Sequence, residues 1–153
     1  MNTANYPNFE LKQYTPEHIK SCAKLFFDVF TDEPFNYQIT ENNMLRYLTD
    51  ISNTPNFRGY MYFTEDRLIG MCFGCLIDYF TGLSYDIKEI AVAKDCQGIG
   101  AGAAFLHAIE DDLAKINVEA VTLATQKGIP AFKFYEKNGY SASGSTVYMS
   151  KRL

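Results

Sequence analysis

With 153 residues, the chain has the length of a single domain that buries a substantial core, so we expect one domain over residues 1–153. The formal net charge of −4 argues against electrostatic binding of nucleic acid or of an anionic membrane, whereas a cationic substrate is compatible with it. No apolar run approaches the length of a membrane span, and the first seven residues lack the pattern of a leader peptide, so we expect a cytoplasmic protein.

The first half of the chain shows the periodicities of both strands and helices. Apolar and polar residues alternate over residues 9–14 as in a half-buried strand, and Thr15-Pro16-Glu17 then supplies a cap, a proline and an acid for a helix start. The next predicted elements are that helix to residue 30, a helix over 40–51, and an antiparallel hairpin of strands 57–64 and 68–80.

A strand that runs into a glycine turn and then a helix is the feature on which the functional argument depends. The strand is predicted over residues 85–92, the helix over 103–116, and Gly98, Gly100 and Gly102 lie between them. Glycines let the backbone bend tightly and let a ligand approach it, and the first amides of a helix have no partner within the helix. With the helix dipole, the turn is a predicted anion site, best suited to phosphate.

Two familiar phosphate-binding patterns fit this turn poorly. A Walker loop would need a Lys-Ser or Lys-Thr pair after the glycines, and none follows. Gly98, Gly100 and Ala103 do satisfy the dinucleotide pattern G-x-G-x-x-A. However, the acid that should end the next strand is missing, because Glu119 precedes the strand predicted over residues 120–124. The turn also lies past the middle of the chain, which leaves room for barely one strand-helix-strand unit.

The last part of the chain completes the predicted element order. It comprises the strand over 120–124, a helix over 130–138, and strands over 140–142 and 146–151 that are joined at Gly144 and Ser145. The full order is β-α-α-β-β-β-α-β-α-β-β. We therefore expect an α/β (α+β) fold with a mixed, mostly antiparallel sheet and helices on both of its faces.

Two stretches of the second half carry recognisable motifs. Gln97-Gly98-Ile99-Gly100-Ala101-Gly102 begins five residues after the strand end at Val92, and Ala131-Phe132-Lys133-Phe134-Tyr135-Glu136-Lys137-Asn138-Gly139-Tyr140 lies downstream. The first matches the Q/R-x-x-G-x-G/A signature of the GNAT superfamily of N-acetyltransferases, and the second resembles that family's A-x-x-hydrophobic-Y-E-K-x-G-F/Y stretch. The resemblance implies a GNAT-like fold. It also implies transfer of an acetyl group from acetyl-CoA to a primary amine by direct attack in a ternary complex.

The resemblance further implies which residues hold coenzyme A. Backbone amides of residues 98–103 would bind its pyrophosphate, and residues 90–92 would pair with its pantetheine arm as an added strand does. The Val92 N–H, or a neighbour, would donate to the oxyanion. The cofactor-binding residues expected on this basis are Ile90, Ala91, Val92, Gln97, Gly98, Ile99, Gly100, Ala101, Gly102, Ala103, Phe134 and Tyr135.

Transfer to an amine also needs a base, because a free alkyl amine has a pKa near ~10.4 and arrives mostly as the ammonium. Glu89 and Asp86 are the candidates; a regular strand would put them on opposite faces, which a bulge would change. We favour Glu89, with a solvated edge charge as the alternative interpretation of either residue. The resemblance makes Tyr135 the general acid, since a phenol (pKa ~10) still holds a proton where a thiolate (pKa ~8.5) needs one.

The cysteines and histidines are weaker candidates for chemistry. Cys72 and Cys75 form a C-x-x-C pair, but positions three apart on a strand point to opposite faces. His18 and His107 lie at no ligand spacing, so we expect no metal site. Cys96 adjoins the glycine turn, but no histidine is placed to activate it as a nucleophile.

The acceptor is the least determined part of the prediction. Acids and aromatics could line a mouth for a small cationic amine such as a polyamine or an aminosugar: Phe30, Asp32, Glu33, Tyr37 and Phe80. A protein N-terminus or a lysine side chain is the alternative acceptor, while an acyl-CoA sensor and a nucleotide-binding redox protein are rival functions. Members of the family often pair through their last strands, so the resemblance also allows a homodimer.

Overall fold

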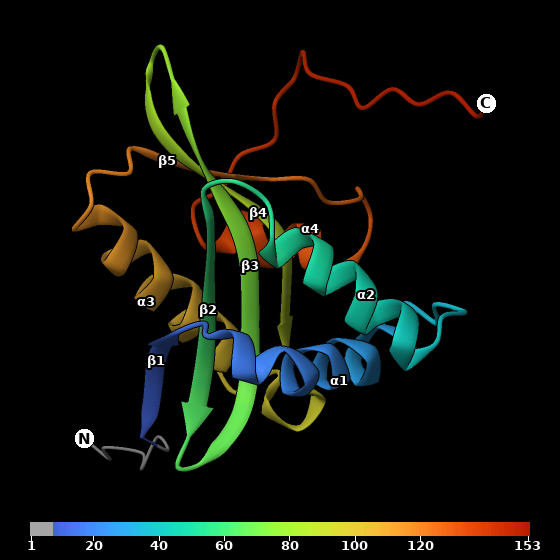
Figure 1. The fold of residues 1–153 in the computed structure, drawn as a ribbon. Coiled ribbons are helices and arrows are strands. Elements are labelled where there is room, and N and C mark those ends of the chain that lie inside the picture. Colours follow the sequence, from blue (N-terminus) through green and yellow to red (C-terminus); the bar gives the residue numbers. More distant parts are fainter. Residues whose placement is uncertain (1–7) are drawn as a thin grey trace. The chain divides into compact units, whose positions relative to one another are not determined.

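Within residues 8–153, which the computed structural model describes, a five-stranded sheet is the frame of the N-terminal part (Figure 1). The contacts separate into one unit that ends at Leu123 and one that begins at Ala124. The first unit contains β1 (Phe9–Gln13), α1 (Ile19–Phe30), α2 (Glu41–Ser52), β2 (Phe57–Thr64), β3 (Arg67–Tyr79), β4 (Gly82–Val92), α3 (Ala101–Ala114) and β5 (Ala120–Leu123), and the second contains α4 (Pro130–Lys137). The predicted order is confirmed from the first strand to this helix, and a single domain over residues 1–153 stays a prediction.

The sheet is mixed and mostly antiparallel, as the sequence predicts. Its strands follow the order β1-β2-β3-β4-β5, with antiparallel pairing up to β4 and parallel pairing between β4 and β5. The β4–β5 pairing runs from Ser84 opposite Ala120 to Ile87 opposite Leu123. Because β5 ends there, β4 continues to Val92 without β5 beside it.

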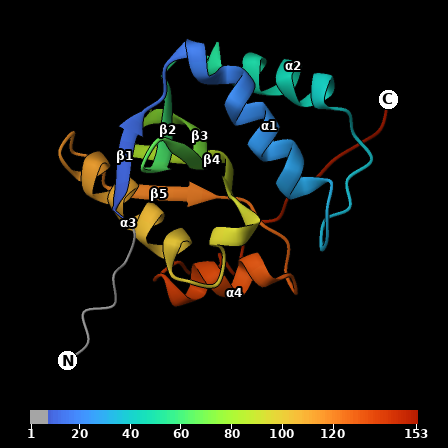
Figure 2. The same cartoon turned by 90° about the horizontal axis from the view of Figure 1, so that it is seen from below.

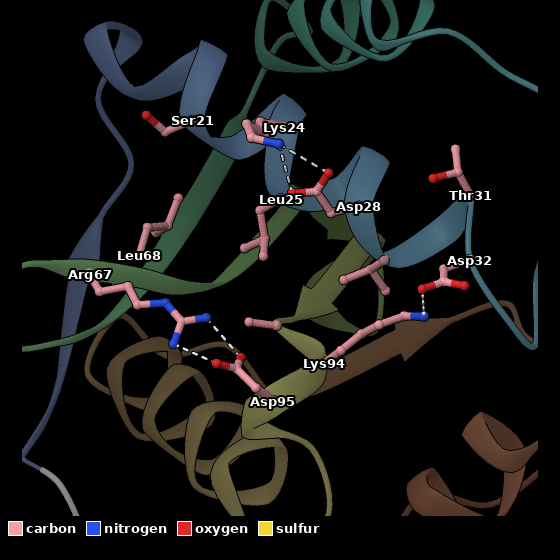
Figure 3. Close-up of a pocket in the computed structure, with 12 residues that line it drawn as sticks. Ser21, Lys24, Leu25, Asp28, Thr31, Asp32, Arg67, Leu68, Lys94 and Asp95 are labelled. Carbon is pink, nitrogen blue, oxygen red and sulfur yellow. Dashed lines mark hydrogen bonds and ion pairs between the residues drawn. The ribbon is translucent and has the colours of Figure 1, made fainter.

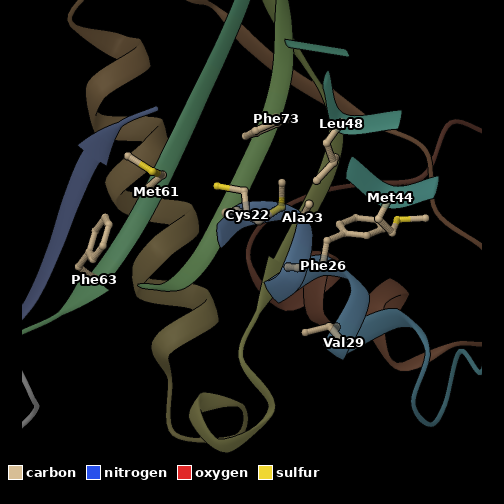
Figure 4. Packing of buried hydrophobic residues seen from close by; sticks show 11 residues of the cluster. Cys22, Ala23, Phe26, Val29, Met44, Leu48, Met61, Phe63 and Phe73 are labelled. Atoms are coloured by element: carbon tan, nitrogen blue, oxygen red, sulfur yellow. The ribbon is translucent and has the colours of Figure 1, made fainter. Parts of the chain in front are cut away.

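Helices α1 and α2 cover one face of the sheet and α3 covers the other (Figure 2), so helices lie on both faces as predicted. On α2, Thr40 caps the helix start by accepting a hydrogen bond from the Asn43 N–H at 3.1 Å. Between these two helices and the sheet, each large apolar side chain that is buried stabilises the fold by roughly 1.5–3 kcal/mol. The core under α1 and α2 consists of Cys22, Ala23, Phe26, Val29, Met44, Leu48, Met61, Phe63, Met71, Phe73 and Ala91 (Figure 4).

Packing and a hydrogen-bond network fix α3 on the opposite face. The Phe105 ring is fully buried and stacks on Tyr62 with 4.8 Å between ring centroids. Farther along the helix, Asp112 Oδ2 accepts hydrogen bonds from Arg58 Nη2 at 2.7 Å and from Tyr60 Oη at 3.0 Å. These contacts hold α3 at a fixed position on the sheet, and therefore also its N-terminal end.

The predicted final pair of strands is wrong. Residues 140–153 contain no strand, although the turn between them forms, with Ser143 Oγ accepting from the Thr146 N–H at 3.1 Å. Two short strands alone have little to stabilise them, and residues 124–153 offer no larger apolar face of their own for such a hairpin to cover. Val147, Tyr148 and Met149 are accordingly exposed.

None of the helices in residues 8–153 has both the length and the apolar character of a membrane span. Within the same residues, no three histidine, cysteine, aspartate or glutamate side chains gather as metal ligands would. The expectation about a leader peptide rests on residues 1–7, which lie outside the described part of the chain.

Candidate active site

The turn between β4 and α3 has the backbone conformation that only glycine adopts readily. Gly98 has φ of 77° and Gly100 has φ of 87°, and Gly100 is the residue that caps the start of α3. A residue with a Cβ is strained in this left-handed region. Gln97, the first residue of the motif, donates from Nε2 to the Val92 carbonyl oxygen at 2.8 Å. The motif glutamine therefore ties the turn to the end of β4.

The groups at this turn fit a phosphate ligand. The first backbone bond of α3 joins the Ala104 N–H to the Gly100 carbonyl oxygen at 3.0 Å, so the amides of residues 101–103 lie ahead of the helical ladder. A Cβ atom at Gly98 or Gly100 would meet no atom of the described residues within 4 Å beyond the neighbouring residues, so open space adjoins the turn. Unpaired helix amides, the positive end of the dipole and free space are what a diphosphate requires.

The edge of β4 beyond Ile87 presents backbone groups for a further strand-like partner. The Ala93 N–H donates to the Ile69 carbonyl oxygen at 2.7 Å, so this amide faces β3. Amide directions alternate along a strand, and therefore the amides of Ile90 and Val92 face away from β3, where β5 has already ended. An extended ligand arm could bind this edge by strand addition. Ala91 can contribute only its backbone, because its side chain lies in the core.

A bulge in β4 puts both candidate acids on one face of the sheet. Glu89 pairs with Phe73 and Ile87 with Gly74, so Lys88 is the extra residue. Asp86 pairs with Cys75, which lies two positions from Phe73 and shares its face. Glu89 and Asp86 therefore both lie on the face that α1 and α2 cover. A regular strand would have separated them.

The two acids have different surroundings. Glu89 is half-buried, and its Oε1 accepts a hydrogen bond from Tyr47 Oη on α2 at 2.6 Å. Burial raises the pKa of Glu89 above its usual value, and the Tyr47 hydrogen bond partly opposes that shift. Asp86 forms an ion pair with Lys88 at 2.5 Å and accepts from Thr122 Oγ1 at 2.7 Å. Glu89 is thus the acid with a neutral partner and Asp86 the acid with a cationic one.

Tyr47 is the residue of this site that sequence analysis missed. It lies 42 residues before Glu89, and no local motif connects the two positions. The only signal was the predicted helix over residues 40–51, which indicated a helix near the sheet but not which of its side chains reaches β4. Burial is the larger cause and the hydrogen bond to Glu89 the smaller cause of a raised pKa for Tyr47. Its phenol therefore stays protonated and remains a donor.

Four of the five expected acceptor residues lie together at the end of α1 and in the loop that follows it. The rings of Phe30 and Tyr37 stack at 5.7 Å between centroids, and the Tyr37 N–H donates to the Phe30 carbonyl oxygen at 2.9 Å. Asp32 forms an ion pair with Lys94, and its Oδ1 accepts from the Glu33 N–H at 3.0 Å. The charge of Asp32 is therefore already balanced within the protein, whereas Glu33 adds a second acid beside it.

The structure does not bring Phe80 to this group. Phe80 is 99% exposed and lies in the turn between β3 and β4. Lys94, the ion-pair partner of Asp32, follows the opposite end of β4. An 11-residue strand separates its two ends by roughly 35 Å, so Phe80 and Asp32 cannot line the same mouth.

A cavity of about 750 Å³ lies beside α1, close to the end of β4 (Figure 3). Ala93 lines it, whereas Glu89 lies four residues earlier on the strand, roughly 13 Å away. Glu89 does not line the cavity, and Ala91, between Glu89 and Ala93 on the strand, packs into the core. The cavity is lined by Ser21, Lys24, Leu25, Asp28, Val29, Thr31, Asp32, Arg67, Leu68, Ala93, Lys94 and Asp95.

The cysteines behave as inert side chains. Cys72 Sγ lies 3.8 Å from Tyr85 Oη, whereas Cys75 Sγ lies 3.1 Å from Thr54 Oγ1 on the face that α2 covers. The C-x-x-C thiols therefore point to opposite faces. Cys96 is buried, and burial raises its pKa, which keeps the thiol protonated and argues against a nucleophilic role.

Phe134 and Tyr135 lie on α4, in the second unit. Their rings contact each other at 5.3 Å between centroids, and Tyr135 also contacts the Tyr140 ring at 5.6 Å. The Tyr140 N–H donates to the Tyr135 carbonyl oxygen at 3.0 Å, which closes the end of the helix. The cofactor-binding role of both residues, and the acid role of Tyr135, stay predictions from the sequence resemblance.

Comparison with known proteins gives a consistent picture. The family model described as acetyltransferase (GNAT) domain matches residues 10–151. Among solved structures, a possible acetyltransferase from Clostridium difficile 630 is 14% identical with a TM-score of 0.79, covering 95% of this chain and 98% of that one. A GNAT family acetyltransferase from Staphylococcus aureus is 19% identical with a TM-score of 0.69, covering 95% and 98%.

One further structural relative is described with a ligand. An aminoglycoside acetyltransferase from an uncultured soil metagenomic sample, in complex with sisomicin, is 19% identical with a TM-score of 0.73, covering 95% of this chain and 96% of that one. At these identities, the structural likenesses show the fold. No curated protein sequence matches the chain.

Proposed function

The chain belongs to the GNAT family of acetyltransferases, and on that premise we propose that it acetylates a primary amine of a small cationic molecule, polyamine-like or aminosugar-like, by direct attack in a ternary complex. The observation that carries the proposal is the arrangement of β4, which bears a half-buried Glu89 and ends at an open, amide-lined glycine turn. The aminoglycoside acetyltransferase of the same fold supports the choice of acceptor class.

The residues that would hold the cofactor are those of the turn and of the β4 edge. Acetyl-CoA, when bound, supplies the acetyl thioester. The amides of residues 98–103 would bind its diphosphate, and the backbone of Ile90 and Val92 would hold its extended arm. The Val92 N–H would also donate a hydrogen bond to the developing oxyanion.

Glu89 is the proposed general base. An alkyl ammonium must lose a proton before its nitrogen can attack, and a carboxylate accepts that proton better when its own pKa is raised. Burial raises the pKa of Glu89. Asp86 is less suited, because its carboxylate oxygens are already engaged by an ion pair with Lys88 and a hydrogen bond from Thr122.

The acceptor is proposed to bind near Phe30, Glu33 and Tyr37, where rings could contact its apolar parts and Glu33 could pair with an ammonium group. Tyr135 is the proposed general acid, on the sequence resemblance alone. A homodimer is likewise a proposal, which sedimentation of the full chain would test.

Binding and turnover measured together test the proposed function. Thermal shift with coenzyme A, acetyl-CoA and NAD side by side should show stabilisation by the first two only. Release of free thiol should then occur with spermidine or an aminoglycoside and be slower with a lysine-containing peptide. Stabilisation by NAD alone would point to a redox protein, and coenzyme A binding without turnover on any amine would point to a sensor. Preference for the peptide would point to a protein acetyltransferase.

A further inference from the structure

The Tyr47 hydroxyl lies in an unusual position for an exposed helix residue. The side chain is 42% exposed, yet its Oη donates to Glu89 Oε1 at 2.6 Å, across the contact between α2 and β4. Such a short bond to a carboxylate is of the stronger, charge-assisted kind. The bond fixes one oxygen of the proposed base.

The fold does not need this bond to hold α2 in place. Met44 and Leu48, one helical turn apart, bury their side chains in the core under α2, and Thr40 caps the helix start. The ring of Tyr47 is not part of that core. Removing its hydroxyl should therefore leave the position of α2 unchanged, so a function for the hydroxyl can be tested without unfolding the protein.

The bulge at Lys88 is what makes the contact available. If the register set by the Ile87–Gly74 pair continued regularly, Glu89 would lie opposite Cys72, on the face that α3 covers and away from Tyr47. With the bulge, Glu89 lies opposite the fully buried Phe73, on the face that α2 covers. The bulge and Tyr47 thus act on the same carboxylate, the first by orienting it and the second by holding it.

From this geometry we propose that Tyr47 is the positioning residue of the reaction, which holds Oε1 of Glu89 so that Oε2 takes the proton of the substrate amine. The inference rests on the proposed function. In the step, an N–H bond of the amine breaks, its proton bonds to Oε2, and the electron pair stays on nitrogen for the attack. Tyr47 keeps its own proton throughout, since burial and its bond to Glu89 raise the pKa of the phenol.

Few other titratable groups face this carboxylate. On the neighbouring strand β3, Cys75 shares the face of Glu89 whereas Cys72 points to the opposite face. Along β4 itself, Asp86 and Lys88 pair with each other. The part of α1 that packs on the sheet is apolar. Tyr47 is therefore the group whose removal should change the titration of Glu89 most.

The variant Tyr47→Phe tests the proposal, because it keeps the ring and removes only the donor. Loss of a donor to the charged carboxylate favours its protonated form, so the pKa of Glu89 should rise by about one unit. Titration of the Glu89 side-chain carbon by NMR, in the protein without substrate, measures this directly. The acid limb of the kcat/KM profile should move to higher pH by the same amount. Activity should fall about tenfold below the limb and remain near wild type above it.

Two companion variants make the result specific. Adding Tyr47→Phe to Glu89→Gln should cause almost no further loss, because the two residues act through one bond. Tyr148 is an exposed tyrosine of residues 140–153. The control variant Tyr148→Phe should change neither the NMR titration of Glu89 nor the pH profile of kcat/KM.

If Tyr47→Phe is active but leaves the titration of Glu89 unshifted, the inference about Tyr47 is overturned while the proposed function stands. An equal loss of kcat/KM at every pH would also overturn the inference, because it would mark Tyr47 as merely structural. If Glu89 titrates with the expected shift but the wild type transfers no acetyl group to any amine, the proposed function fails and the pair has no catalytic meaning.

Discussion

Two carboxylates along β4 and the segment that follows it, Glu89 and Asp95, have contrasting partners. In the middle of the strand, half-buried Glu89 accepts a hydrogen bond from the neutral phenol of Tyr47. Just beyond the strand, Asp95 accepts hydrogen bonds from Nη1 and Nη2 of Arg67, at 2.7 Å each. Burial raises the pKa of Glu89, whereas the hydrogen bonds and charge of Arg67 lower the pKa of Asp95.

The contrast teaches which acids of this chain can do proton chemistry. A carboxylate beside a cation is held in its charged form and has little affinity for a proton, so Asp95 and the Lys94-paired Asp32 are suited to holding the segment in place. A carboxylate that is desolvated beside a neutral donor keeps a higher proton affinity. On this ground Glu89 is chemically distinct from the other acids along this path.

Replacing Glu89 by glutamine should produce the largest effect on this comparison. The change removes the proton acceptor while keeping the size and the Tyr47 contact, so kcat/KM should fall by roughly 10²-fold or more. The remaining rate should keep rising toward high pH, because only amine that is already deprotonated can attack. Initial rates of thiol release between about pH 6 and 10 measure both the fall in kcat/KM and the rise of the remaining rate with pH.

The matched control for this variant is Asp86→Asn, on the same face of the same strand. Because Asp86 is paired with Lys88, its loss should cost far less activity than the loss of Glu89. Coenzyme A affinity should be unchanged in both variants. A greater loss in Asp86→Asn would assign the base to Asp86 instead.

Gly100→Ala should have the next largest effect, and on binding instead of proton transfer. The methyl group meets no atom of the described residues within 4 Å, but φ of 87° is strained for alanine by roughly 1–2 kcal/mol. We expect a melting temperature lower by a few degrees and weaker coenzyme A binding, with an unchanged pH profile. Calorimetry and a coenzyme A titration measure these effects.

Gly144→Ala provides the reference for that variant. Gly144 also adjoins open space, but its φ is not in the strained region, so alanine there should leave stability and binding unchanged. Equal effects of the two substitutions would mean that the turn conformation at Gly100 has no special importance.

The sequence was sufficient for features that depend on local pattern. The element order through α4 followed from periodicity and caps, and the sharp turn between β4 and α3 followed from Gly98 and Gly100. The possibility of a bulge in β4 was recognised, but its position was not, because a single extra residue such as Lys88 leaves the apolar pattern almost unchanged. Residues 146–151 alternate as a strand does, yet a strand also needs a partner, which local pattern does not supply.

Features that depend on how helices cross the sheet could not be predicted in the same way. The contact of Tyr47 with Glu89 depends on the packing of Met44 and Leu48, which positions α2 on the core. The pairing of Asp32 with Lys94 depends on where α1 ends. Both join positions far apart in the sequence. The acidic mouth predicted from composition was therefore incomplete, since composition does not indicate that Lys94 already balances Asp32.

The smallest effect is expected for Asp32→Asn, and it tests whether an acid paired within the protein still contributes to substrate binding. Because Lys94 balances its charge, the change should alter KM for a cationic amine by about twofold at most, as for an exposed ion pair. Glu33→Gln, its neighbour, should raise KM more, since Glu33 is the acid proposed to pair with the ammonium group. Steady-state kinetics with spermidine compare the two. A larger rise for Asp32→Asn would show that the substrate displaces Lys94, and the ion pairs beyond β4 would then belong to recognition as well as to structure.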